Sequence, residues 1–160
     1  MNRRTTLVLS TMVLLFCLGV ALPGAFAQQS QFGTAADARA MLGKSVAAVQ
    51  ADETKALDMF ATGEGGFLDR DIYPFCFNIS NGKVRVTQVK NLIGLDIRTR
   101  VDATGKAYGL ELYAAAQKPE GQITEVSYMS QRPGTDTRLF HKVSLVTRVG
   151  DLGCGVGYYK

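Results

Sequence analysis

Apolar residues recur at helical spacing through residues 35–61, which predicts one long amphipathic helix. Alanines separate the larger residues of this stripe, which are Leu42, Val46, Val49, Ala56 and Phe60. Glu53 falls in a gap of the stripe, so we expect a half-exposed acid at the edge of the packed face. The TGEGG segment at 62–66 ends the helix, because glycine readily takes the left-handed conformation that follows a helix C-terminus.

Further along the chain, apolar and polar residues alternate with the period of two that is typical of strands. Five segments show this pattern: 71–79, 83–89, 122–131, 137–149 and 150–160. In the second segment Lys83 and Arg85 alternate with Val84 and Val86, as in an edge strand with one exposed face. The pattern predicts an α+β domain with one long helix packed on an antiparallel sheet.

An irregular segment over residues 90–117, called the excursion below, separates the second and third predicted strands. Residues 90–106 follow no single period, and residues 102–106, DATGK, form a turn. Residues 107–117 then predict a short helix with Leu110, Tyr113 and Ala114 on one side.

The last predicted strand has one bare face, made of Gly153, Gly155 and Gly157. Bulky rings opposite glycines fix the register of paired strands. Three rings share one face of the first predicted strand, namely Tyr73, Phe75 and Phe77. If the two strands are neighbours, the same register brings Cys76 and Cys154 together on the opposite face.

The N-terminus has the features of an export signal. Arg3 and Arg4 precede an apolar run over 7–22, and residues 25–27, AFA, match the A-x-A cleavage pattern. The run is shorter than the roughly 20 residues that span a membrane. We therefore expect a cleaved signal peptide over 1–27, rather than an uncleaved anchor. A single periplasmic or secreted domain over 28–160 would follow, with no stable membrane insertion after cleavage.

Charge and cysteine content narrow the functional classes. The formal net charge of +4 falls further once Arg3 and Arg4 are removed, and the remaining basic residues form no stripe that would bind nucleic acid. Removal of Cys17 leaves two cysteines, and a disulfide is the usual state of such a pair outside the cytoplasm. Two unpaired buried thiols are the alternative.

Residues suited to catalysis are few. His141, the one histidine, lies in a predicted strand with no evident nucleophile or acid partner, and HExxH, CxxC and DxDxDG spacings are missing from the sequence. We therefore expect no enzyme activity, no metal site and no cofactor. Lys142 lies in the middle of the predicted strand 137–149, on a mostly apolar face. Arg132 begins the loop before this strand, and Tyr128 lies in the preceding predicted strand, 122–131. These side chains could hold a carboxylate if their face lines a pocket; otherwise they are solvated surface groups.

A series of short segments in fixed order resembles the single Cache domain family. The segments are Gly66-Phe67, Asp71-Ile72-Tyr73-Pro74-Phe75, Asn81-Gly82-Lys83, Ile93-Gly94, Asp102 with Gly105-Lys106, Tyr128 with Pro133, Lys142, and Gly155-Val156-Gly157-Tyr158-Tyr159. The resemblance implies an extracytoplasmic small-ligand sensor. It also implies a PAS-like antiparallel sheet of strand order 2-1-5-4-3 with a long N-terminal helix packed across it.

The chain departs from this family pattern in two places. Many members carry an Ala-His-Pro motif after the first hairpin, where this chain has Val86-Thr87-Gln88. Family sensors usually continue into a membrane helix and a signalling module, whereas this chain ends at Lys160. It resembles the free-standing exported members, which would signal through a partner.

The sequence thus predicts a non-catalytic sensor that binds a small organic ligand, with a carboxylate favoured. Tyr73 and Phe75 would wall the pocket, unless these rings pack under the long helix. Tyr128 would donate a hydrogen bond, and Lys142 with Arg132 would neutralise the charge. Arg98, from the segment over the pocket, is a weaker candidate. The alternative is an interaction module without a ligand that docks on a membrane histidine kinase or chemoreceptor.

Overall fold

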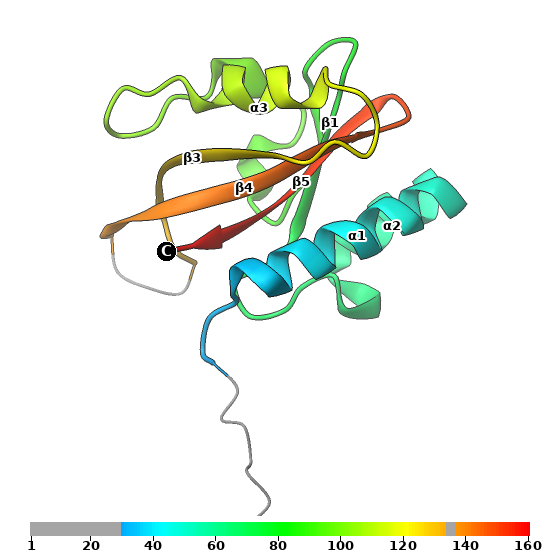
Figure 1. Ribbon diagram of the computed structural model, residues 1–160, viewed down its shortest axis with the longest axis horizontal. Coiled ribbons are helices and arrows are strands. Elements are labelled where there is room, and N and C mark those ends of the chain that lie inside the picture. The colour runs from blue at the N-terminus through cyan, green and yellow to red at the C-terminus, as the bar shows by residue number, and fades with distance from the viewer. Residues whose placement is uncertain (1–29, 134–136) are drawn as a thin grey trace, which may run out of the picture.

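The computed structural model describes residues 30–133 and 137–160, so the expected signal peptide over 1–27 lies outside the described residues. A five-stranded antiparallel sheet forms the centre, in the order β2-β1-β5-β4-β3. Figure 1 shows helices α1 and α2 on one face of the sheet and helix α3 on the other. The predicted α+β class and strand order are confirmed.

The predicted long helix is two helices, α1 (Ala35–Ala51) and α2 (Glu53–Thr62). Asp52 separates them in an extended conformation (φ −162°), and its side chain accepts a hydrogen bond from the backbone N–H of Lys55. An acid that caps a new helix start explains the break, which the continuous apolar stripe does not reveal. The predicted end of the helix is confirmed, because Gly63 follows α2 with a φ of 80°.

All five strands are shorter than predicted. Their bounds are β1 (Pro74–Asn78), β2 (Val84–Val86), β3 (Thr124–Gln131), β4 (Leu139–Val149) and β5 (Leu152–Tyr159). The β1–β2 register shifts between Cys76 and Phe77, so Val86 pairs with Cys76 and Val84 with Phe77. This irregularity sends Val84 and Val86 to opposite sides of the sheet, whereas the alternation placed them on one side.

Two apolar clusters hold the layers together. The first lies between α1, α2 and one sheet face and includes Leu42, Phe60, Leu145, Cys154 and Val156. The second joins the other sheet face to the excursion and includes Phe77, Ile97, Leu112, Ala116 and Val146. The excursion contains the 3-10 helices η2 (Lys90–Leu92) and η3 (Ile97–Thr99) and helix α3 (Tyr108–Ala116); a further 3-10 helix, η1 (Glu64–Gly66), follows α2.

Helix α3 packs through a face that the sequence analysis did not predict. Its buried residues are Gly109, Leu112, Ala115 and Ala116, whereas Leu110 is 54% exposed. A Cβ on Gly109 would overlap the carbonyl oxygen of Ile97. The glycine allows α3 to approach the η3 segment closely, and this approach decides which side of the helix is buried.

The predicted pairing of rings with bare backbone is confirmed at two of the three glycines. Phe77 lies over Gly153 and Phe75 over Gly155, and Cys76 pairs with Cys154 in a disulfide. At Gly157, however, the side chain of Lys142 occupies the space that we assigned to Tyr73. Tyr73 precedes the first residue of β1, so strand alternation does not direct its ring toward β5.

Substitution of Gly153 by alanine is expected to lower the free energy of unfolding by about 1–3 kcal/mol. The new Cβ would lie 2.5 Å from Cβ of Ala116 and 2.6 Å from Cζ of Phe77, and both of these residues are fully buried. Gly43→Ala is the matched control, because a Cβ there meets nothing within 4 Å. That helical substitution should stabilise the protein by up to about 1 kcal/mol. Urea unfolding compares the two, and equal midpoints would contradict the expected packing of Phe77 on Gly153.

Candidate functional site

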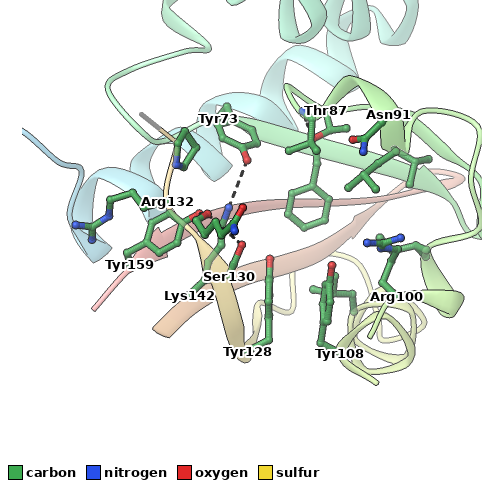
Figure 2. A pocket seen from close by; sticks show the side chains of 18 of the residues that line it. Tyr73, Thr87, Asn91, Arg100, Tyr108, Tyr128, Ser130, Arg132, Lys142 and Tyr159 are labelled. Carbon is green, nitrogen blue, oxygen red and sulfur yellow. Dashed lines mark hydrogen bonds between the residues drawn. The ribbon is translucent and has the colours of Figure 1, made fainter. Parts of the chain in front are cut away.

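A cavity of about 620 Å³ lies between the sheet and the excursion. This volume is within the range of sites that bind small molecules. Figure 2 shows side chains from both sides converging on it, including Tyr73, Tyr128, Lys142 and Arg100. Tyr73 and Phe75 both line this cavity, and Phe75 packs against the second cluster rather than under the long helix.

Lys142 is a buried cation at this cavity. It projects from β4, is only 6% exposed, and its Nζ lies 3.4 Å from the hydroxyl of Tyr73. Nζ also lies 5.0 Å from the ring centre of Tyr73 and 4.9 Å from that of Tyr159. Within residues 30–133 and 137–160, no carboxylate forms an ion pair with it. Burial lowers the pKa of Lys142 to about 8, although the charge of Asp71 acts in the opposite direction.

Two neutral hydroxyl groups accompany this cation. Tyr128 pairs with Lys142 across β3 and β4, and its hydroxyl lies 3.0 Å from Oγ of Ser144. Burial raises the pKa of both Tyr128 and Tyr73 well above the usual range, so both stay protonated near neutral pH. Each phenol can therefore donate a hydrogen bond to a ligand oxygen.

The ring of Tyr128 stacks on Tyr108, the first residue of α3, with 4.0 Å between ring centres and 10° between planes. Asp102 holds this arrangement, because its carboxylate accepts a hydrogen bond from the backbone N–H of Met129 in β3. The same carboxylate accepts from Lys106 and Thr104 in the turn before α3, and these bonds keep the pKa of Asp102 far below its usual value. The turn is thereby tied to the strand that presents Tyr128.

Arg132 is at the cavity, but its guanidinium is directed elsewhere. Nε lies 3.3 Å from Oδ2 of the buried Asp71, and the guanidinium carbon lies 4.0 Å from the ring centre of Phe32. Figure 2 shows the guanidinium pointing away from Lys142. Asp71 therefore balances the charge that we expected Arg132 to contribute to ligand binding. Asp71 also accepts a hydrogen bond from the N–H of Gly33, which ties the segment before α1 to this end of the cavity.

Arg98 lies outside the group of described residues that line the cavity. Its guanidinium donates to both carboxylate oxygens of Asp96, at distances of 2.6–3.0 Å, and to the carbonyl of Asn81. The guanidinium also lies 5.1 Å from the ring centre of Tyr113. These contacts hold Arg98 beside the turn between β1 and β2.

Arg100 lines the cavity instead, although it was not among the predicted site residues. Its backbone follows η3 and is held by hydrogen bonds to the carbonyl of Ile97 and from the N–H of Gly109. Its side-chain Nε is buried without a hydrogen-bond partner among the described residues. No periodic pattern runs through residues 90–106, so the sequence offers no signal for which of its side chains point inward.

The composition of the cavity wall favours an anion. Its described lining includes three basic residues, Arg100, Arg132 and Lys142, and no acidic residue. Aromatic rings and hydroxyl groups make up much of the rest. Across the described residues, no cluster of three His, Cys, Asp or Glu side chains could hold a metal ion. The described helices are also all too short or too polar to cross a membrane.

The sequence matches no family model and no curated protein. Three solved structures share its fold at 20–21% identity. A methyl-accepting chemotaxis protein from Vibrio parahaemolyticus RIMD 2210633 gives a TM-score of 0.60 at 20% identity, over 78% of this chain and 86% of that one. A periplasmic sensor domain of a chemotaxis protein gives 0.56 at 20% identity, over 76% and 86%. A Cache chemosensory domain, solved to explain carboxylic acid recognition, gives 0.54 at 21% identity, over 76% and 82%.

Proposed function

We propose that this chain, which has the fold of Cache-type periplasmic sensor domains, is a non-catalytic sensor that binds a small organic carboxylate outside the cytoplasm. One observation carries the proposal: Lys142 presents a buried cation to a cavity in which no described carboxylate pairs with it. A buried charge is costly unless it is paired and hydrogen-bonded. An anionic ligand would supply that pairing.

The groups around Lys142 suit a carboxylate in particular. The hydroxyl of Tyr73 lies 3.4 Å from Nζ, and Tyr128 is the cross-strand neighbour of Lys142. A carboxylate has two acceptor oxygens, so it can pair with an ammonium and accept from a phenol at the same time. The ring of Phe75 offers an apolar wall for the remainder of the ligand. The similar Cache chemosensory domain, which recognises a carboxylic acid, supports this choice.

A sensor domain must pass its ligand-binding signal to another protein. Two of the similar structures belong to chemotaxis proteins, which supports a membrane chemoreceptor, or a histidine kinase in the same role, as the partner. The domain would then report the carboxylate to that partner by docking in the periplasm.

Isothermal titration calorimetry of the exported protein tests the proposal. Titration with a series of monocarboxylates and dicarboxylates at pH 7 should give saturable binding for at least one acid. Amines of matched size should give none, because the described wall has no acidic residue to pair with them. Binding of amines alone, or no binding of any acid, would contradict the proposal. Co-purification with a chemoreceptor in the second case would favour the ligand-free docking module.

Carboxylate affinity is expected to fall by about tenfold per pH unit above pH 8. The pKa of Lys142 is about 8, and only the protonated amine attracts an anion. Burial raises the pKa of Tyr73 and Tyr159, so these neighbours stay neutral in this range. Titrations between pH 6 and 9.5 measure the trend. An affinity that stays constant to pH 9.5 would show that Lys142 does not hold the ligand.

The stability of the ligand-free protein should change with pH in the opposite direction. Between pH 8 and about 9.5 the unfolded chain keeps a proton on Lys142, whose usual pKa is 10.5, whereas the folded protein releases it. When the unfolded state binds more protons, stability rises with pH. Urea unfolding over this pH window should therefore show rising stability while calorimetry shows falling affinity.

A further inference from the structure

We propose that the cavity has a second anion-binding position at Arg100, so that its preferred ligand is a small dicarboxylate with one carboxylate at Lys142 and the other at Arg100. This inference rests on the proposed function and narrows the ligand class. It starts from two cations at one cavity, neither of which forms an ion pair among the described residues.

The guanidinium of Arg100 lacks a partner where one is expected. Its Nε is buried, and no described residue accepts a hydrogen bond from it. Leaving a charged donor unsatisfied in a buried position is destabilising, because the group has lost water without gaining an acceptor. A guanidinium presents several N–H groups in a rigid plane that matches the two oxygens of a carboxylate. A ligand carboxylate would therefore satisfy Arg100 better than a neutral group would.

The backbone of Arg100 is held in place, so its position is part of the fold. Its N–H donates to the carbonyl of Ile97, and its carbonyl accepts from the N–H of Gly109, both at 3.1 Å. A Cβ on Gly109 would overlap the carbonyl oxygen of Ile97 and lie 3.0 Å from the nitrogen of Arg100. The close approach of α3 therefore supports the segment from which Arg100 projects into the cavity.

The two cations lie at different ends of the cavity. Lys142 is the cross-strand partner of Tyr128. The carbonyl of Arg100 accepts a hydrogen bond from the N–H of Gly109, which follows Tyr108. The stacked rings of Tyr108 and Tyr128 lie between these two positions, and Figure 2 shows Lys142 and Arg100 on opposite sides of the ring pair. A ligand with a carboxylate at each end can therefore place one carboxylate at each cation.

Arg132 does not provide this second position. Its Nε faces Asp71 at 3.3 Å, and its guanidinium is packed among aromatic rings, with Phe32 at 4.0 Å. Asp71 already supplies the negative charge at that end of the cavity. Arg100 has no such acid within the described part of the chain, which leaves it as the position for the second carboxylate.

Calorimetry with matched acids tests the inference. Malonate, succinate, glutarate and adipate are compared with monocarboxylates of the same carbon number at pH 7 and fixed ionic strength. At least one dicarboxylate should bind about tenfold or more tightly than its monocarboxylate counterpart, since each charge-assisted pair of this kind is worth at least that factor. Arg100→Gln should remove this preference, because it lowers the affinity for the dicarboxylate by about tenfold or more and the affinity for monocarboxylates by much less.

Arg98→Gln is the matched control, because Arg98 lies two residues earlier and is paired with Asp96 outside the cavity. It should leave both affinities and the preference unchanged. If monocarboxylates bind as tightly as dicarboxylates, or if Arg100→Gln keeps the preference, the second position is refuted while the proposed function stands. If no acid binds at all, both are refuted.

Discussion

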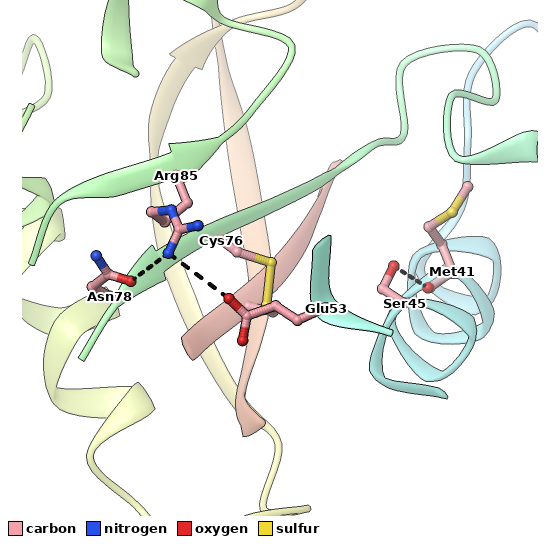
Figure 3. The surroundings of a disulfide bond; sticks show 7 residues. Met41, Ser45, Glu53, Cys76, Asn78 and Arg85 are labelled. Atoms are coloured by element: carbon pink, nitrogen blue, oxygen red, sulfur yellow. Dashed lines mark hydrogen bonds and ion pairs between the residues drawn. A yellow bond between two sulfur atoms is a disulfide. The ribbon is translucent and has the colours of Figure 1, made fainter. Parts of the chain in front are cut away.

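Replacement of both Cys76 and Cys154 by alanine is expected to lower the free energy of unfolding by about 4 kcal/mol. The disulfide joins β1 to β5 and closes a loop with a sequence separation of 78 residues. Such a link restricts the unfolded chain, and its loss restores that conformational freedom. Figure 3 shows the disulfide in its surroundings, with the Arg85–Glu53 ion pair nearby. Both sulfurs are buried in the first cluster, so their removal also loosens the contact between sheet and helices.

Urea unfolding with and without a reductant measures this effect. The reductant should lower the stability of the natural protein and leave that of the double alanine variant unchanged. Intact-mass analysis after alkylation provides the control, because the oxidised protein should bear no label on Cys76 or Cys154. Two labelled thiols in the natural oxidised protein would contradict the disulfide itself.

Lys142→Met is expected to weaken carboxylate binding by about a hundredfold or more, and also to stabilise the ligand-free protein by about 1–3 kcal/mol. We expect the two effects to share a cause. The buried ammonium lowers stability because no described acid pairs with it, and the same group would attract the proposed carboxylate. Methionine has a similar length, so it can occupy the space over Gly157 that the Lys142 side chain fills. If the Lys142→Met variant loses carboxylate binding but keeps its stability, Lys142 serves ligand binding and is not needed for the fold.

Calorimetry and urea unfolding of the variant provide both measurements. Lys106→Met serves as the control, since Lys106 pairs with Glu111 and the carbonyl of Ser127, outside the cavity lining. It should bind carboxylates as the natural protein does. A Lys142→Met variant with unchanged affinity would place the anion elsewhere, and one with lower stability would show that the ammonium contributes to the fold.

Local sequence patterns were enough to predict that the first and last strands of the sheet are neighbours. Ring-bearing and glycine-bearing faces on 71–79 and 150–160 complement each other, and this complementarity brings the first and last strands together with Cys76 opposite Cys154. These features are readable because strand alternation is strictly local and because a bare backbone face can be filled in few ways. Lys142 was recognisable for the same reason, as a charge on an apolar face of a regular strand.

The directions of the long cationic side chains depend on contacts that appear only in the folded chain. Arg132 turns to Asp71, Arg98 to Asp96 and Arg100 to the cavity, although all three carry the same flexible side chain in or beside irregular segments. Asp71 is distant in the chain from Arg132, Asp96 lies in the same irregular segment as Arg98, and Arg100 forms no ion pair among the described residues. No local period describes these arrangements. The packed face of α3 was decided in the same way, by the contact of Gly109 with Ile97. Periodicity therefore specifies the elements of this protein, while contacts between distant segments specify which charges face the cavity.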